Sequence, residues 1–189
     1  SQVSQIGIDE VSRRKGHDYL TVFGDLQASR VIYLAAGRES QVVDKFKGYL
    51  NSKDVAPDQI KSFCLDMWPA YIKGLNKNFP KSKHIFDRYH ILSMANKAVD
   101  QVRREEQKTQ SALKRTRFLW LKNRSKLKKS EREQLERLER LNLQTWRAMR
   151  YREELSHLWD FDNYDDAELF LNHWYFRATH SRLEPVKEL

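Results

Sequence analysis

The sequence predicts an α/β fold: a mixed five-stranded sheet with helices, followed by an all-α subdomain. Short runs rich in β-branched residues, separated by turn residues, occur only in the first 90 residues. Beyond Tyr89 apolar residues recur at spacings of three and four, and no glycine follows Gly74, so helices are expected there. We therefore expect a core at 1–90, a helical subdomain at 91–180, and at 181–189 the truncated start of a return to the core.

The core is expected to follow the order strand, strand, strand, helix, strand, helix, strand. The strands are predicted at 6–8, 19–23, 31–36, 60–65 and 84–86, and the helices at 42–50 and 68–75. The first three strands, joined by turns, indicate a β-meander. Ser40 can cap the first helix, and Pro69 lies in the first turn of the second, where proline is tolerated.

The helical subdomain is expected to contain at least three helices. A helical stripe runs from Ile91 to Val102, and a break is predicted at 123–130. Ser130 to Glu133 fits a capping box for the next helix. A further break is predicted at 160–166, before a last helix.

The composition excludes several classes of protein. The 189 residues are 40% hydrophobic and 32% charged, which is enough apolar material for a folded core. Cys64 is the only cysteine, so the chain is not a disulfide scaffold. The longest apolar run, 31–36, is far shorter than the roughly 18 residues of a membrane span. The sequence does not open with a secretory signal, and we expect a cytoplasmic protein.

Positive charge is concentrated in the middle of the chain. The net charge is +9, and residues 103–129 contain 11 basic residues against two acidic ones. Such a stretch attracts polyanions, of which a phosphate backbone is the commonest, although a solvated helix face is the alternative. The candidate DNA-binding residues are Arg13, Arg14, Lys15, Arg103, Arg104, Lys114, Arg115, Arg117, Lys122, Arg124, Lys126, Lys128 and Lys129.

Acidic residues follow three of the predicted strands. Asp9, Asp66 and Asp87 come after the first, fourth and fifth strands. Chemistry in open α/β sheets collects at the carboxyl ends of the strands. Phosphoryl transfer on polynucleotides needs carboxylates that share two divalent ions, and two or three carboxylates suffice for Mg²⁺ or Mn²⁺.

The strand order decides which of these aspartates can share an ion. In the order 3-2-1-4-5, strands one and four are neighbours roughly 4.8 Å apart, so Asp9 and Asp66 can do so. Asp87 would lie one strand further out and is an auxiliary candidate. We therefore predict Asp9 and Asp66 as the catalytic and metal-binding pair. The alternative is that an aspartate after a strand caps the next helix.

Five segments carry a resemblance to a known family. They are Ile6 to Glu10, Asp66 to Tyr71, Phe79-Pro80, Phe86 to His90, and Asn96 to Asp100. In their order and spacing, the chain resembles over essentially its whole length the catalytic region of bacterial insertion-sequence transposases of the DDE type, in the ISL family. The resemblance implies a ribonuclease H-like core with an α-helical insertion after the fifth strand.

The resemblance also implies an activity and its partners. Such enzymes nick DNA at insertion-sequence ends and transfer the strand to target DNA, with two Mg²⁺ ions expected in the complete enzyme. It implies a bacterial, nucleoid-associated protein, and dimers are usual for such enzymes. Glu10 and His90 fall within the matching segments and join Asp87 as auxiliary candidates. For His90, a polar residue at a helix start is an equal alternative.

One feature departs from the family pattern. The family's third acid is a glutamate on a helix after the insertion, but Glu168, Glu184 and Glu188 lack the neighbours of that motif. We therefore expect an incomplete fragment whose third acid lies beyond Leu189. Two other classes remain open: a ribonuclease H-like nuclease, and a non-catalytic, basic helical protein that binds DNA. Only the enzymes require the strand-end aspartates to bind metal.

Overall fold

The chain folds as two compact units, residues 1–91 and 92–189, called here the α/β unit and the helical unit. The structure is a computed structural model that describes residues 3–12 and 18–189. The predicted DNA contacts Arg13, Arg14 and Lys15 lie outside the described residues.

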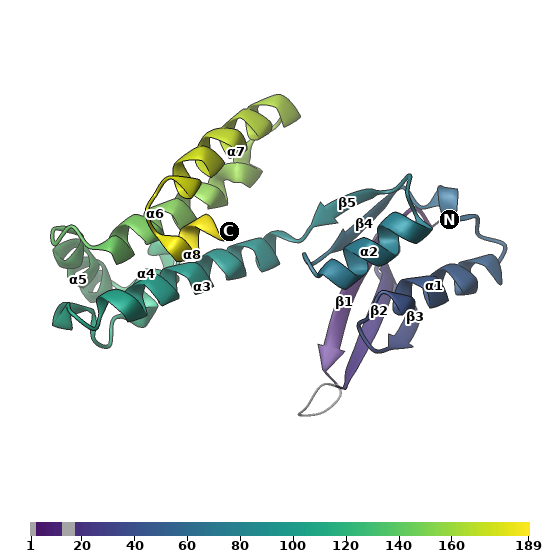
Figure 1. Ribbon diagram of the computed structural model, residues 1–189, viewed down its shortest axis with the longest axis horizontal. Coiled ribbons are helices and arrows are strands. Elements are labelled where there is room, and N and C mark those ends of the chain that lie inside the picture. Colours follow the sequence, from purple (N-terminus) through teal and green to yellow (C-terminus); the bar gives the residue numbers. More distant parts are fainter. Residues whose placement is uncertain (1–2, 13–17) are drawn as a thin grey trace. The chain divides into compact units, whose positions relative to one another are not determined.

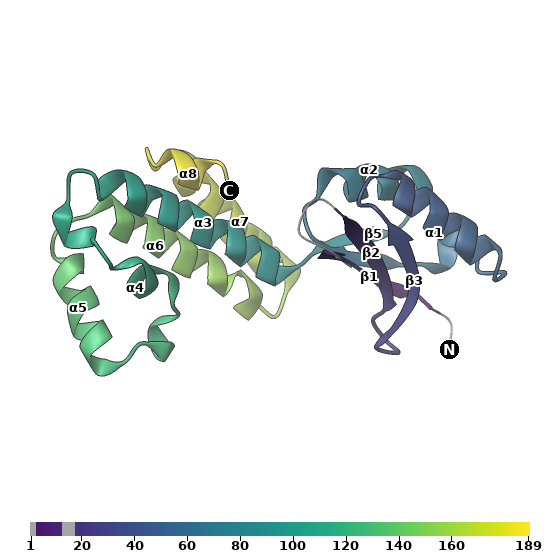
Figure 2. The same ribbon diagram turned by 90° about the horizontal axis from the view of Figure 1, so that it is seen from below.

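A five-stranded mixed sheet forms the α/β unit (Figures 1 and 2). Its strands are β1 (Gln5–Ser12), β2 (Tyr19–Asp25), β3 (Arg30–Ala36), β4 (Ser62–Leu65) and β5 (Lys83–Phe86). The order is β3-β2-β1-β4-β5, in which β2 is antiparallel to both β1 and β3, while β1, β4 and β5 run parallel. The predicted mixed sheet is confirmed, and β1 and β4 are neighbours.

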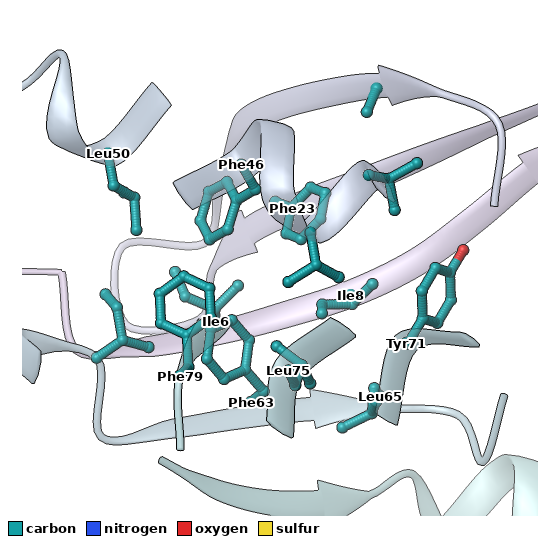
Figure 3. Packing of buried hydrophobic residues seen from close by; sticks show 14 residues of the cluster. Ile6, Ile8, Phe23, Phe46, Leu50, Phe63, Leu65, Tyr71, Leu75 and Phe79 are labelled. Atoms are coloured by element: carbon teal, nitrogen blue, oxygen red, sulfur yellow. The ribbon is translucent and has the colours of Figure 1, made fainter. Parts of the chain in front are cut away.

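Two helices, α1 and α2, cover one face of this sheet (Figure 2). They span Gln41–Asn51 and Pro69–Asn78. Strand side chains alternate between the two faces, so Ile6 and Ile8 point to the helices and are buried. Phe23 stacks on Phe46 of α1 with ring centroids 4.1 Å apart, within the cluster drawn in Figure 3. This layer anchors β1, which contains Asp9, and β4, which Asp66 directly follows.

Local structure differs from the prediction at several points of this unit. β1 continues beyond Asp9 to Ser12, because it stays paired with β2 along that length. The fourth strand begins two residues late, at Ser62, since a 3-10 turn at Pro57–Gln59 precedes it. Ser40 lies at the N-cap position of α1, but its side chain makes no capping hydrogen bond.

Gly74 of α2 packs so closely against α1 that a side chain does not fit. A Cβ atom there would lie 2.9 Å from the carbonyl oxygen of Ser40 and 2.8 Å from Cγ2 of Val43. We expect Gly74→Ala to lower the free energy of unfolding by about 1–3 kcal/mol, because the helices must move apart.

Gly48 of α1 is the matched control, since a Cβ atom there meets nothing within 4 Å. Gly48→Ala should raise the free energy of unfolding by about 0.5–1 kcal/mol, the usual gain when alanine replaces glycine inside a helix. Urea unfolding of both variants measures the two effects. A stabilising Gly74→Ala would contradict the close packing of α1 on α2.

Helices and short 3-10 turns build the helical unit, all of whose residues are described, as predicted for the second part of the chain. The helices are α3 (Arg88–Glu106), whose first turn belongs to the α/β unit, α4 (Arg117–Leu121), α5 (Lys129–Glu139), α6 (Gln144–Ser156), α7 (Tyr164–Thr179) and α8 (Glu184–Lys187). Its largest buried side chains include Leu113, Trp120, Leu135, Met149 and Trp174. Among the described residues, no helix is both long and apolar enough to cross a membrane.

The start of α5 differs from the predicted capping box. The helix begins ahead of Ser130, because Glu131 accepts a hydrogen bond from the backbone N–H of Lys128 at 2.8 Å. The ammonium of Lys122 donates a second hydrogen bond to Glu131 at 2.7 Å. These two bonds hold the pKa of the Glu131 carboxyl below its ordinary value, and the bond from the Lys122 side chain has the larger effect.

Residues 181–189 belong to the helical unit. Within this segment Val186 of α8 is buried, and α8 contacts α7. Arg147 of α6 donates a hydrogen bond to the carbonyl oxygen of Ser181 at 2.9 Å. That residues 181–189 are the truncated start of a return to the core stays a prediction.

Candidate active site

The three predicted aspartates fall in one row across the sheet. The parallel ladders pair the residues two positions before them: Gly7 with Cys64, and Cys64 with Ile85. Extending both registers by two residues brings Asp9, Asp66 and Asp87 to the same level. This level lies just beyond the carboxyl ends of β4 and β5 and beyond the part of β1 that pairs with β4. The row therefore follows from the register of three neighbouring strands.

All three aspartates line one hollow of about 270 Å³ in the α/β unit. Asp9 alternates with the buried Ile8, so it points away from α1 and α2 to the opposite face of the sheet. His90 and Cys64 also line the hollow. The structure thus brings together the predicted pair and two of the three auxiliary candidates.

Each aspartate uses one carboxylate oxygen to accept a backbone hydrogen bond. Oδ1 of Asp9 accepts from the N–H of the next residue at 2.8 Å. Oδ1 of Asp66 accepts from Trp68 at 3.0 Å and Oδ1 of Asp87 from Tyr89 at 2.7 Å, at the starts of α2 and α3. Asp66 and Asp87 therefore do stabilise helix starts. The second oxygens of Asp9 and Asp66 make no hydrogen bond or ion pair within the described part of the chain.

The auxiliary candidates His90 and Glu10 lie in different places. Nδ1 of His90 is buried without a hydrogen bond, and it lies 3.6 Å from Oδ2 of Asp87. Glu10 alternates with Asp9 and so points to the helix-covered face, where its Oε1 lies 3.8 Å from the guanidinium of Arg38. His90 is thus placed to act beside Asp87, whereas Glu10 does not face the hollow.

Carboxylate oxygens of this kind suit a hard divalent cation. Among the described residues, no group of three or more His, Cys, Asp or Glu side chains is placed to hold a metal ion. Mg²⁺, however, is usually held by one or two carboxylates, with water and substrate phosphates as its other ligands. Asp9 and Asp66 fit that requirement, because they lie at the same level on neighbouring strands. Each also has a second carboxylate oxygen without a partner in the described part of the chain.

Cys64 provides a chemical probe of the same hollow. Burial raises the pKa of its thiol above the ordinary value, and the negative charge of Asp87 raises it further. Only the thiolate reacts, so a raised pKa means less thiolate at any pH below it. We expect iodoacetamide to modify Cys64 more slowly in the folded chain than in urea at pH 8, with a rate that climbs as pH rises further. Mass spectrometry measures both rates, and equal rates would contradict the raised pKa.

The predicted DNA-binding residues of the helical unit differ in their exposure and in their ion pairs. Arg103 is 7% exposed and donates to Asp100 at 2.9 Å, so we drop it from the proposed DNA contacts. Lys122 and Arg124 form ion pairs with glutamates of the same unit. Arg104 and Arg117 ion-pair with Asp100 and are nevertheless exposed. The other exposed residues are Lys114, Arg115, Lys126, Lys128 and Lys129.

Arg38 is a residue near the site to which sequence reasoning gave no role. Its guanidinium carbon lies 4.2 Å from the ring centroid of Tyr19 and 4.6 Å from that of Trp68. Nε1 of Trp68 donates to the carbonyl oxygen of Arg38 at 3.1 Å. These contacts fix Trp68, whose N–H binds Asp66. No spacing marks Arg38 in the sequence, because its partners come from three separate segments.

Three features define a ribonuclease H-like protein. They are the mixed sheet in this strand order, the acidic row at the ends of its parallel strands, and the helical part after β5. Comparison with known proteins gives the family. The profile of the ISL3-type DDE transposases, described as "Transposase", matches residues 6–189. The chain belongs to this family of insertion-sequence transposases.

Curated relatives agree with that assignment. The chain is 27% identical over 189 residues to "Transposase for insertion sequence element IS1001" of Bordetella parapertussis, an alignment covering 96% of this chain and 46% of the relative. It is 28% identical over 141 residues to "Transposase for insertion sequence element IS1557" of Mycobacterium tuberculosis, covering 75% and 31%. The chain thus spans less than half of the length of these relatives.

Proposed function

We propose that this chain carries the metal-dependent phosphoryl-transfer site of a transposase that nicks DNA at insertion-sequence ends and transfers the strand into target DNA. One observation carries the proposal: Asp9, Asp66 and Asp87 come from three neighbouring strands in register and line one hollow. Membership of the transposase family supports it.

Asp9 and Asp66 would hold the divalent ions, Mg²⁺ or Mn²⁺. When bound, two such ions activate the attacking oxygen and stabilise the charge on the leaving oxygen. The backbone N–H groups of Glu10 and Trp68 each donate to one oxygen of their aspartate, which orients the carboxylate and leaves its other oxygen for a ligand. The attacking oxygen belongs to water during nicking and to a DNA 3′-hydroxyl during strand transfer, so no covalent enzyme intermediate is needed.

The partner in this proposal is DNA, and exposed lysines and arginines of the helical unit would contact its phosphates. These are Arg104, Lys114, Arg115, Arg117, Lys126, Lys128 and Lys129. A third acid from outside residues 1–189, association with the nucleoid and a homodimer stay predictions.

A second candidate function is favoured by the helix-start hydrogen bonds. Asp66 and Asp87 bind the backbone N–H groups of Trp68 and Tyr89, as helix caps do. On this view the acidic row is structural, and the helical unit binds DNA without catalysis by the α/β unit. The position of Asp9 does not fit this second function. No helix begins directly after β1 within the described residues, so Asp9 has no helix start to cap.

A crystal soaked in manganese tests the proposal. We expect anomalous density beside both Asp9 and Asp66, with Asp87 contributing through water. Titration of the chain with Mn²⁺ in solution should show the same binding. Crystals without density at the row, together with no binding in solution, would reject the enzyme and favour the structural role of the aspartates.

A further inference from the structure

A cleft of about 560 Å³ lies in the helical unit, lined by α3 and α4. Lys97, Arg104 and Arg117 contribute three cationic side chains to its wall, against the carboxylates of Asp100 and Glu105. Glu105 is ion-paired with Lys108, and this pair reduces the repulsion of an anionic ligand by Glu105. The cleft therefore presents more positive than negative charge.

Asp100, which is buried, gathers three guanidinium groups around one carboxylate. Nε of Arg103 donates to Oδ1 at 2.9 Å, and Nε of Arg104 and of Arg117 lie 3.1 Å and 3.3 Å from Oδ2. Arg103 and Arg104 come from α3, whereas Arg117 comes from the start of α4. One negative charge does not balance three positive ones, so the cluster remains an attractive place for a further anion.

Arg104 and Arg117 keep donors available for such an anion. Their side chains are 67% and 51% exposed, and each approaches Asp100 through Nε. Within the described part of the chain, neither guanidinium donates a hydrogen bond of normal geometry, so their terminal amino groups have no protein acceptor. A guanidinium offers these groups as a fork that matches two phosphate oxygens. Because Asp100 already holds both arginines, less side-chain freedom is lost when a ligand binds.

We propose that this cleft binds a phosphodiester group of the DNA backbone, with Arg104, Arg117 and Lys97 as ligands and Asp100 as the residue that positions the two arginines. Among the residues that line the cleft, all of them described, none is aromatic, so bases have no ring on which to stack. The contact is therefore independent of base sequence. The proposal rests on the proposed function in taking DNA as the partner.

The test measures the affinity of the chain for a short mixed-sequence DNA duplex by fluorescence anisotropy over a series of salt concentrations. Arg104→Ala combined with Arg117→Ala should weaken binding about tenfold or more and reduce the slope of log K against log salt by about 1. Arg140→Ala, which removes the same kind of charge from an exposed position outside the cleft, should leave the slope unchanged. Circular dichroism checks that each variant is folded.

The positioning role of Asp100 has its own readout. Removing a negative charge normally tightens DNA binding. Asp100→Asn should instead weaken it, because the two arginines lose their common anchor. Tighter binding by a folded Asp100→Asn would overturn the positioning role. If Asp100→Asn unfolds the helical unit, the double variant of Arg104 and Arg117 still tests whether the cleft binds DNA.

The outcomes separate this proposal from the proposed function. A double variant that binds DNA like Arg140→Ala would overturn the cleft while leaving the metal site of the α/β unit untouched. A wild-type chain that does not bind DNA would overturn the cleft too, whatever Mn²⁺ titration shows at Asp9. Thermal stabilisation by inorganic phosphate that disappears in the double variant, with DNA affinity unchanged, would assign the cleft to a small phosphate and also overturn the proposal.

Discussion

Replacing Asp9 or Asp66 by asparagine is expected to remove Mn²⁺ binding at the acidic row and to slow DNA nicking by at least about 100- to 1,000-fold. Asparagine keeps the shape of the side chain and an oxygen that can accept the bond from the neighbouring backbone N–H. It removes the negative charge that holds a divalent cation. The fold should therefore persist while the chemistry is lost. Mn²⁺ titration of the chain and nicking of insertion-sequence DNA by the full-length protein measure the two effects.

Asp58→Asn is the matched control for this pair. Asp58 is an exposed aspartate of the same unit, ion-paired with Lys81. The hydrogen bond from Lys81, and then its positive charge, lower the pKa of the Asp58 carboxyl. The same chemical change there should leave metal binding and nicking at wild-type levels. Asp87→Asn should have an intermediate effect, because Asp87 lies at the outer end of the row. If both Asp9→Asn and Asp66→Asn nicked DNA at the wild-type rate, the acidic row would be structural.

The acidic row shows how far a sequence predicts a site of this kind. The position of Asp9, Asp66 and Asp87 after short apolar runs predicts that they gather at one edge, and the strand order makes β1 and β4 neighbours. The sequence does not predict that Asp87 lies at the same level as the other two. That level depends on the register of β5 on β4, which is set by pairing between residues far apart in the chain.

The direction of the Glu10 side chain also depends on pairing that the sequence does not show. The first strand was predicted at 6–8, so Asp9 and Glu10 were both expected beyond its end. β1 instead runs on to Ser12 in a hairpin with β2, so the alternation of the strand sends Glu10 to the opposite face. The β-meander was predicted from turn residues, but the length of its first strand depends on cross-strand pairing.

The helical unit was predicted as helical but not in its internal contacts. Apolar spacing of three and four indicates a helix, yet it does not say which charged side chains of two helices meet. Asp100 and Arg117 lie on α3 and α4, and they come together only once the intervening turn folds. The basic run therefore predicted a surface for DNA, whereas the buried carboxylate that orders two of its arginines required the structure.

Trp120→Ala is expected to lower the free energy of unfolding of the helical unit by about 3–5 kcal/mol. Trp120 is fully buried, so truncation leaves a large cavity among its neighbours. Its Nε1 donates to Oγ1 of Thr116 at 3.0 Å, and its carbonyl oxygen accepts from Arg152 of α6 at 3.2 Å. Urea unfolding followed by far-ultraviolet circular dichroism measures the loss.

Phe118 of the same short helix is the control for Trp120, because it is also aromatic but is exposed. Its ring is 66% exposed, so Phe118→Ala should change the free energy of unfolding by no more than about 0.5 kcal/mol. Trp120→Phe should lie between the two, because it keeps much of the ring volume but leaves Thr116 without its donor. If Trp120→Ala were as mild as Phe118→Ala, Trp120 would not be a core residue. Its ring would then be free to stack on a DNA base, a role that full burial excludes in the present fold.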